Sequence, residues 1–119
     1  LSNHKLKILH DVKNIENVMK QHQLAITAAG VSMTELLTIG IPSIIVYGNS
    51  HEKEAAELIH NNQLGINIGL GTKISKKKIL ESVNELLVDF KKRKILHKNN
   101  AKIFDGKGAN RILNDILCN

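Results

Sequence analysis

The sequence predicts an α/β domain: a Rossmann-like parallel sheet of about four strands flanked by helices, with a helical C-terminal end. Two observations carry this prediction. Through the first 70 residues, short apolar runs of strand length alternate with segments of helical spacing, which is typical of βαβ units. After Gly69–Gly71 the apolar residues follow helical spacing alone. The 119 residues form a single domain of ordinary size.

The first part of the chain should supply all the strands and three helices. The expected strands are Leu6–Leu9, Leu24–Thr27, Ser43–Tyr47 and Gly65–Ile68. The intervening segments each place apolar residues on one helical face. Asn14 is a good N-cap for the first of these helices, Ser32 for the second, and Asn61 and Asn62 provide the exit of the third.

The last part of the chain should consist of helices. Ser75 is the expected N-cap of one helix, and a second helix is expected around Ile95 to Phe104. The motif Asp105–Gly108 then interrupts the chain. A closing helix from Ala109 to Leu117 should turn its apolar side chains inward, namely Ile112, Leu113 and Ile116.

The positive charge is concentrated in one region. The formal net charge is +6 at neutral pH, and Lys73–Lys102 holds ten of the basic residues but only three acidic ones. Nucleic-acid modules interleave such charge with stacking aromatics, whereas the aromatic residues here are only Tyr47, Phe90 and Phe104. We therefore expect no nucleic-acid partner. A solvated helix face is the favoured interpretation, and a surface for an anionic partner is the alternative.

Several features bear on the setting of the protein. The chain begins at Leu1, almost within an expected strand, and we interpret it as a piece of a longer protein. No apolar run approaches the ~20 residues that a membrane span requires, so no membrane span is expected. Cys118 is the single cysteine and can form no internal disulfide, which favours a reducing, cytoplasmic location.

The most informative stretch is a small-residue turn between an expected strand and a helix. Ala28-Ala29-Gly30 is followed by Val31-Ser32-Met33-Thr34-Glu35. This order places amide groups and a helix N-terminus at the carboxyl edge of a parallel sheet, where a diphosphate can bind. The hydroxyls of Ser32 and Thr34 could hold phosphate oxygens, and Glu35 could accept hydrogen bonds from a ribose diol. A purely structural alternative is a capping box with Ser32 as N-cap and Glu35 folded back.

Four segments of the chain resemble a known family: Asn14–Met19, Leu24–Glu35, Gly40–Ser43 and Asp105–Ala109. Together they resemble the C-terminal half of the UDP-sugar hydrolases of pseudaminic acid synthesis, the PseG family. Spore-coat polysaccharide proteins share the pattern, as does, more distantly, the peptidoglycan N-acetylglucosaminyltransferase. All have the GT-B architecture. The resemblance covers nearly the whole chain.

The resemblance implies roles for particular residues. The backbone at Val12 would read the uracil, Gly30 to Met33 would cradle the diphosphate, and Glu35 would hold the ribose hydroxyls. The loop Gly48–Glu52, with Asn49 and His51, would face the sugar. His51 stands where family members often carry Gln, and this difference leaves the sugar specificity open. Gln23 stands where they usually carry Asp, and we interpret this second difference as structural.

The chain itself offers no catalytic set. Hydrolysis needs a positioned acid or base, and no Ser/His/Asp set, carboxylate pair or metal-ligand spacing is present in the sequence. His10 beside Asp11 is a weak candidate, because adjacent residues on an extended chain point to opposite sides. The resemblance implies that the catalytic His lies on the N-terminal half, across the cleft. No metal and no cofactor are expected.

Several functional hypotheses remain open. The first is the UDP-sugar-binding half of a hydrolase that cleaves C1–O and releases UDP in the synthesis of a sialic-acid-like surface sugar, inactive without its missing N-terminal domain. The second is the donor-binding lobe of a glycosyltransferase. A third places the module behind an acylneuraminate cytidylyltransferase. The non-enzyme hypothesis is a Rossmann-like interaction domain that docks through Lys73–Lys102.

Overall fold

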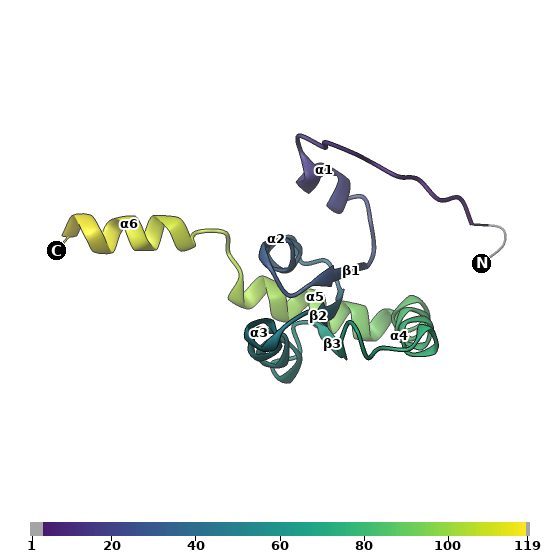
Figure 1. The fold of residues 1–119 in the computed structure, drawn as a ribbon. Helices are drawn as coiled ribbons and strands as arrows, with labels where there is room; N and C mark the ends of the chain where they lie inside the picture. The colour runs from purple at the N-terminus through teal and green to yellow at the C-terminus, as the bar shows by residue number, and fades with distance from the viewer. Residues whose placement is uncertain (1–3, 119) are drawn as a thin grey trace.

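The computed structural model describes residues 4–118. Their elements alternate between helix and strand and then become helical (Figure 1). In chain order they are α1 (Ile15–Met19), β1 (Ala25–Ala28), α2 (Val31–Ile39), β2 (Ser43–Tyr47), α3 (Ser50–Asn61), β3 (Ile66–Leu70), α4 (Lys76–Val88), α5 (Phe90–Ile103) and α6 (Gly108–Cys118). The α/β class and the helical C-terminal end are confirmed.

The sheet has three parallel strands in the order β1-β2-β3 within the described residues. Ala25 pairs with Ser43, and Ile44 pairs with Ile66, so the strands of neighbouring βαβ units lie side by side. The register shifts between Ile45 and Val46, where β3 has one additional residue. Because all three strands run in the same direction, their carboxyl ends meet at one edge of the sheet.

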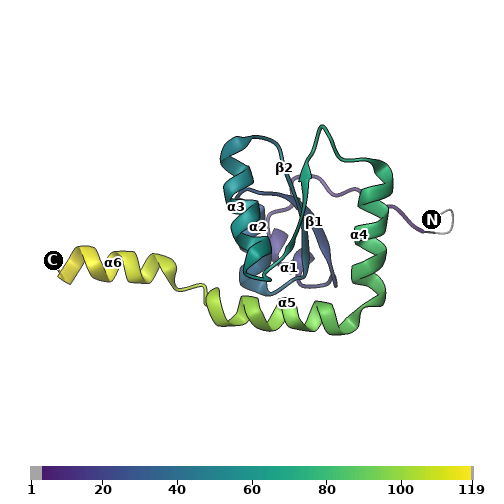
Figure 2. The same cartoon turned by 90° about the horizontal axis from the view of Figure 1, so that it is seen from below.

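Helices cover both faces of this sheet, and the central strand β2 supplies both cores. Ile45 packs in a cluster with side chains of α2 and α3, whereas Ile44 packs in a second cluster with Leu86 of α4 and Leu96 of α5. Figure 2 shows α3 and α4 on opposite sides of the strands and α5 crossing beneath them. Ile44 and Ile45 are fully buried, which explains why β2 is a continuous apolar run.

The fourth expected strand does not form. Leu6–Leu9 carries no secondary structure, and the side chains of Leu6 and Ile8 are 88% and 69% exposed. The alternation of Lys and apolar residues fits a strand, but an extended segment becomes a strand only through hydrogen bonds to a neighbour. Within residues 4–118 this segment pairs with no strand, so the sheet has three strands instead of about four.

The closing helix forms at the expected place but not in the expected packing. Ile112, Leu113 and Ile116 are 64%, 52% and 68% exposed, and α6 projects away from the sheet in both views (Figures 1 and 2). The prediction of an inward apolar face is therefore wrong. Helical spacing fixes which residues share a face, whereas the direction of the helix is set by the preceding turn.

Local capping signals identify some helix starts and miss others. Ser75 Oγ accepts the N–H of Lys78 at 3.1 Å, as predicted. Asn14 precedes α1 but makes no side-chain cap. The helix expected around Ile95 begins earlier, at Phe90, because Asp89 Oδ1 accepts the N–H of Lys92 at 2.9 Å. An Asp at an N-cap stabilises a helix start typically by ~1 kcal/mol relative to alanine.

Three residues of α5 form hydrogen bonds with the connections beside the sheet, and one of them is Asn99, whose Nδ2 donates to Gln63 O at 2.9 Å. The buried Asn100 donates through Nδ2 to the carbonyl oxygens of Leu64 at 2.8 Å and Leu96 at 2.9 Å. His97 Nδ1 lies 2.7 Å from the carbonyl oxygen of Gly40, at the end of α2. These contacts hold α5 against the α2–β2 and α3–β3 connections. No helix among the described residues is both long and apolar enough to cross a membrane.

Candidate functional site

The glycine turn lies at the carboxyl edge of the sheet, as predicted. Ala28, the last residue of β1, pairs with Val46 near the end of β2, so the turn at Ala29 and Gly30 lies beside the loop at Gly48 and Asn49. Gly30 is the N-cap of α2, with extended backbone at φ −120° and ψ −152°. This geometry directs the N-terminus of a nine-residue helix toward the edge at which parallel α/β sheets bind ligands.

Gly30 and the first two residues of α2 are open to solvent, whereas Ala29 before them is buried. Gly30, Val31 and Ser32 are exposed, and a Cβ added at Gly30 would meet no atom within 4 Å. The amides of Val31 and Ser32 belong to the first helical turn, where no intrahelical acceptor is available. The Met33 amide instead donates to Gly30 O at 3.1 Å. The turn can therefore offer two amides and a positive helix end to an anion.

Two residues that were predicted to contact phosphate, Met33 through its amide and Thr34 through its hydroxyl, are already engaged within the protein. Met33 is only 4% exposed and belongs to the core cluster under the sheet. The Thr34 hydroxyl donates its single hydrogen to Val31 O at 2.7 Å, so in this conformation it has none to donate to a phosphate oxygen, contrary to the prediction. The burial of Met33 follows from its place on the apolar face of α2, and a hydroxyl that bonds to the carbonyl three residues earlier is a common local contact in helices.

The capping-box interpretation of Glu35 is wrong. Gly30, not Ser32, is the N-cap of α2, and α2 has no side-chain cap. A variant of the capping box occurs instead at α3: Asn49 Oδ1 accepts the N–H of Glu52 at 3.0 Å, and Glu52 Oε2 accepts the N–H of Gly48, the residue before the N-cap, at 2.6 Å. Glu35 is exposed, and its carboxylate makes no hydrogen bond or ion pair within residues 4–118. Helix capping therefore does not occupy it.

Two adjoining hollows run from the glycine turn to Glu35. The first, of about 660 Å³, follows β1 and is lined by Gly30 and Ser32. The second, of about 370 Å³, lies between α1 and α2 and is lined by Glu35. Ile15 and Met19 of α1 line both hollows. Glu16, which is ion-paired with Lys20, also lines the second hollow, so a ligand that extends from the turn along α2 would meet two apolar side chains and one carboxylate on its α1 side.

The loop Gly48–Glu52, which was predicted to face the sugar, is mostly exposed, whereas Val12, which was predicted to contact the base, is half-buried. Asn49 is exposed and is used as the N-cap of α3. His51, also exposed, is the second residue of α3, at the carboxyl edge of the sheet. Val12 is half-buried, two residues before the N-cap of α1, and is not among the residues that line the two hollows. The contact of Val12 with a base stays a prediction.

A third hollow lies at the same edge, beside the loop Gly48–Glu52 that was expected to face the sugar, and sequence reasoning missed only the contribution of Gly71. The hollow has a volume of about 490 Å³ and is lined by residues that follow or end each strand, among them Ala28, Tyr47, Glu52 and Gly71. Gly71, on its border, donates its N–H to Tyr47 O at 2.9 Å. The spacing of Asn49 and Glu52 indicates an N-cap and its partner, which predicts the start of α3 but not the hollow.

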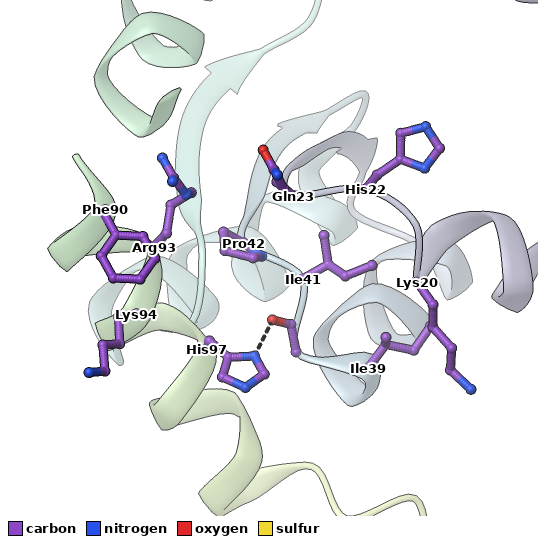
Figure 3. Close-up of a pocket in the computed structure, with 11 residues that line it drawn as sticks. Lys20, His22, Gln23, Ile39, Ile41, Pro42, Phe90, Arg93, Lys94 and His97 are labelled. Carbon is purple, nitrogen blue, oxygen red and sulfur yellow. Dashed lines mark hydrogen bonds between the residues drawn. The ribbon is translucent and has the colours of Figure 1, made fainter. Parts of the chain in front are cut away.

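A separate hollow of about 580 Å³ lies at the opposite, amino edge of the strands. Figure 3 shows its centre formed by Ile41 and Pro42, which precede β2, with Lys20 and Lys94 on opposite sides and pointing apart. The guanidinium of Arg93 is already engaged, because Nη1 donates to Leu87 O at 2.7 Å. The cationic side chains around this hollow therefore do not converge on one point, and the hollow lies away from the glycine turn.

The histidines do not form a reactive group within the described residues. His22 Nδ1 lies 2.7 Å from Val18 O, and His60 Nδ1 accepts the N–H of Asn67 at 3.2 Å. Together with His97, three histidines thus hold backbone groups. In the part of the chain that the structure covers, no group of three His, Cys, Asp or Glu side chains could hold a metal ion.

The late Asp-Gly-Lys-Gly motif forms a defined turn between α5 and α6. Asp105 accepts hydrogen bonds from Arg111 at 2.7 and 3.1 Å and from the N–H of Lys107 at 2.9 Å. The Arg111 guanidinium, followed by the Lys107 amide, lowers the pKa of Asp105 to about 2. The carboxylate is therefore ionised at neutral pH. Gly106, at φ 72°, lines the same hollow as Glu35.

Comparison with known proteins gives two relatives. No family model matches the chain. The spore coat polysaccharide biosynthesis protein SpsG of Bacillus subtilis is 26% identical over 106 residues, which cover 89% of this chain and 31% of SpsG. An uncharacterized protein of Methanocaldococcus jannaschii is 38% identical over 50 residues, 42% of this chain and 10% of that protein. The chain thus spans about a third of the length of the first relative and a tenth of the second, and it is similar over most of its own length to a protein named for polysaccharide biosynthesis.

Proposed function

We propose that this chain is the nucleotide-sugar-binding part of a polysaccharide-biosynthesis enzyme and that its ligand is a UDP-sugar. The observation that carries the proposal is the exposed glycine turn, which leads into α2 at the carboxyl edge of a parallel sheet. The similarity to SpsG over 89% of the chain supports a role in polysaccharide biosynthesis. Glu35, free of capping contacts and lining the adjoining hollow, supports recognition of the nucleoside.

The proposed reaction is hydrolysis of the bond between C1 of the sugar and the diphosphate oxygen. Water attacks C1, the C1–O bond breaks, and UDP leaves with the bonding electrons. The amides of Val31 and Ser32, with the helix dipole, stabilise negative charge on the departing diphosphate. The acid or base that handles the water proton comes, in this proposal, from another part of a longer protein. The surface sugar would be related to pseudaminic or sialic acid.

Replacing Glu35 with alanine should weaken UDP binding without unfolding the chain. A carboxylate that accepts two ribose hydroxyls makes charge-assisted hydrogen bonds, and their loss of about 1.5–3 kcal/mol weakens binding roughly ten- to a hundredfold. Binding is measured by ligand-observed NMR with UDP and 2′-deoxy-UDP. The deoxy ligand should bind less tightly than UDP to the original chain, and the two ligands should become nearly equal in the variant.

Glu54→Ala is the matched control. Glu54 is exposed on α3 and lines none of the hollows that adjoin the turn. It should leave both affinities unchanged. If Glu35→Ala binds UDP as tightly as the original chain does, Glu35 does not contact the ribose, and recognition of the nucleoside has to be sought elsewhere.

A further inference from the structure

The Asp105–Lys107 turn reaches the proposed nucleotide groove although it is 70 residues from Glu35 in the sequence. Gly106 lines the hollow between α1 and α2 together with Glu35 and Thr38. A Cβ added at Gly106 would lie 3.7 Å from Thr38 Cγ2, an ordinary van der Waals distance. The turn therefore lies directly against α2, one helical turn beyond Glu35.

Contacts on both sides hold this turn in place. On the α5 side, Phe104 packs against the core cluster and donates its N–H to Asn100 O at 2.8 Å. On the α6 side, Asp105 is held by Arg111 through both carboxylate oxygens, at 2.7 and 3.1 Å. Bidentate Arg–carboxylate pairs fix orientation as well as distance. The polar groups of Asp105 and Arg111 thus set the path of the backbone through Gly106.

The order of groups along α2 matches the order of groups in a nucleoside diphosphate. With a rise of about 1.5 Å per residue, Glu35 lies ~6 Å and Thr38 ~10 Å along the axis from Val31. A diphosphate at the Val31 and Ser32 amides, with its ribose at Glu35, directs the nucleoside end toward Thr38 and Gly106. The apolar side chains of Ile15 and Met19 line the same hollow from α1.

We infer that the Asp105–Lys107 turn is the end wall of the nucleoside groove and that the Asp105–Arg111 pair positions it. This inference rests on the proposed function and adds a positioning pair that touches no reacting atom. Gly106 presents only backbone to this hollow. The positive φ of Gly106 lets the chain turn sharply enough to place its backbone there.

The test compares UDP with inorganic pyrophosphate, which lacks a nucleoside. Asp105→Asn and Arg111→Gln each remove the bidentate pair, and both side chains are exposed, so neither change opens the core. If the turn then occupies its ordered position about a tenth of the time, UDP binds about tenfold more weakly. Pyrophosphate affinity should change by less than about twofold. The double variant should bind UDP no more weakly than either single variant, because both act through one pair.

Asp115→Asn, on the exposed α6, is the control and should leave both affinities unchanged. The inference is overturned if the original chain binds UDP but Asp105→Asn leaves that affinity unchanged, or lowers UDP and pyrophosphate affinity equally. A different result, in which the original chain binds neither ligand at millimolar concentration, overturns the proposed function itself. The two failures are therefore distinguishable in one set of titrations.

Discussion

Replacing Gly40 with alanine should lower the free energy of unfolding by about 3 kcal/mol, through backbone strain and overpacking. Gly40 ends α2 at φ 85°, and the N–H of Ile41 bonds back to Leu36 O at 2.9 Å. An added Cβ would lie 2.6 Å from Nδ1 and 2.8 Å from Cε1 of His97. The imidazole would have to move and release its hydrogen bond to Gly40 O.

Urea denaturation followed by circular dichroism measures this change. Gly30→Ala is the matched control, because Gly30 has extended backbone and open space at its Cβ position, and it should lower the free energy of unfolding by less than about 1 kcal/mol, the cost of losing a glycine N-cap. Combining Gly40→Ala with His97→Ala removes the clash but keeps the backbone strain, so the double variant separates the two causes. Equal stability of Gly40→Ala and Gly30→Ala would contradict this account of the α2–α5 contact.

Replacing Gly30 with valine should reduce pyrophosphate and UDP affinity at least tenfold, which corresponds to about 1.4 kcal/mol. The two methyl groups of the introduced valine side chain enter the open space in front of the Val31 and Ser32 amides, where the diphosphate is proposed to bind. The fold should tolerate the change, since φ at Gly30 is −120°. Loss of a glycine N-cap should cost less than about 1 kcal/mol of stability. Isothermal titration with each ligand gives the affinities.

Two comparisons control for other sources of anion binding. Gly30→Ala should fall between the original chain and Gly30→Val, because one methyl group blocks less of the space. Lys77→Ala tests the basic N-terminus of α4, where Lys77 is 84% exposed, and should leave pyrophosphate affinity unchanged. If Lys77→Ala weakens binding and Gly30→Val does not, the anion binds to the basic helix start and not to the glycine turn.

The parts of the fold that depend on local order could be predicted from the sequence. The apolar run Ser43–Tyr47 is β2 to the residue, because a strand buried on both faces needs no alternation. Ser75 caps α4 through a side chain three residues from its partner. In contrast, Leu6–Leu9 has the pattern of a strand, but strand formation requires a neighbour that lies elsewhere in the chain or outside it.

The orientation of α6 could not be predicted, for a related reason. Its spacing shows that Ile112 and Ile116 share a face, but the helix direction depends on the Asp105–Arg111 pair and on Gly106. The direction in which the chain leaves this turn depends on contacts in space, which helical spacing does not encode. The start of α5 was a missed local signal, because Asp89 has the position of an N-cap three residues before its partner amide.

The candidate site divides in the same way. Its phosphate end is contiguous in the chain, since strand, turn and helix follow one another from Ala25 to Ile39, so the sequence predicts it directly. The groove beyond Glu35 combines α1, α2 and the turn at Gly106, and no sequence spacing relates these three segments. The packing of Phe104 against the core cluster brings the chain that leads into that turn close to α2.

The most direct test is an amide shift map of the ¹⁵N-labelled chain during titration with UDP. Binding at the glycine turn predicts that the largest shifts occur at Gly30, Val31 and Ser32, with smaller ones around Glu35 and Gly106. Saturable shifts confined to the amino-edge hollow at Ile41 and His97, or to the start of α4, would contradict it. So would the absence of any shift at Gly30–Ser32 with millimolar UDP.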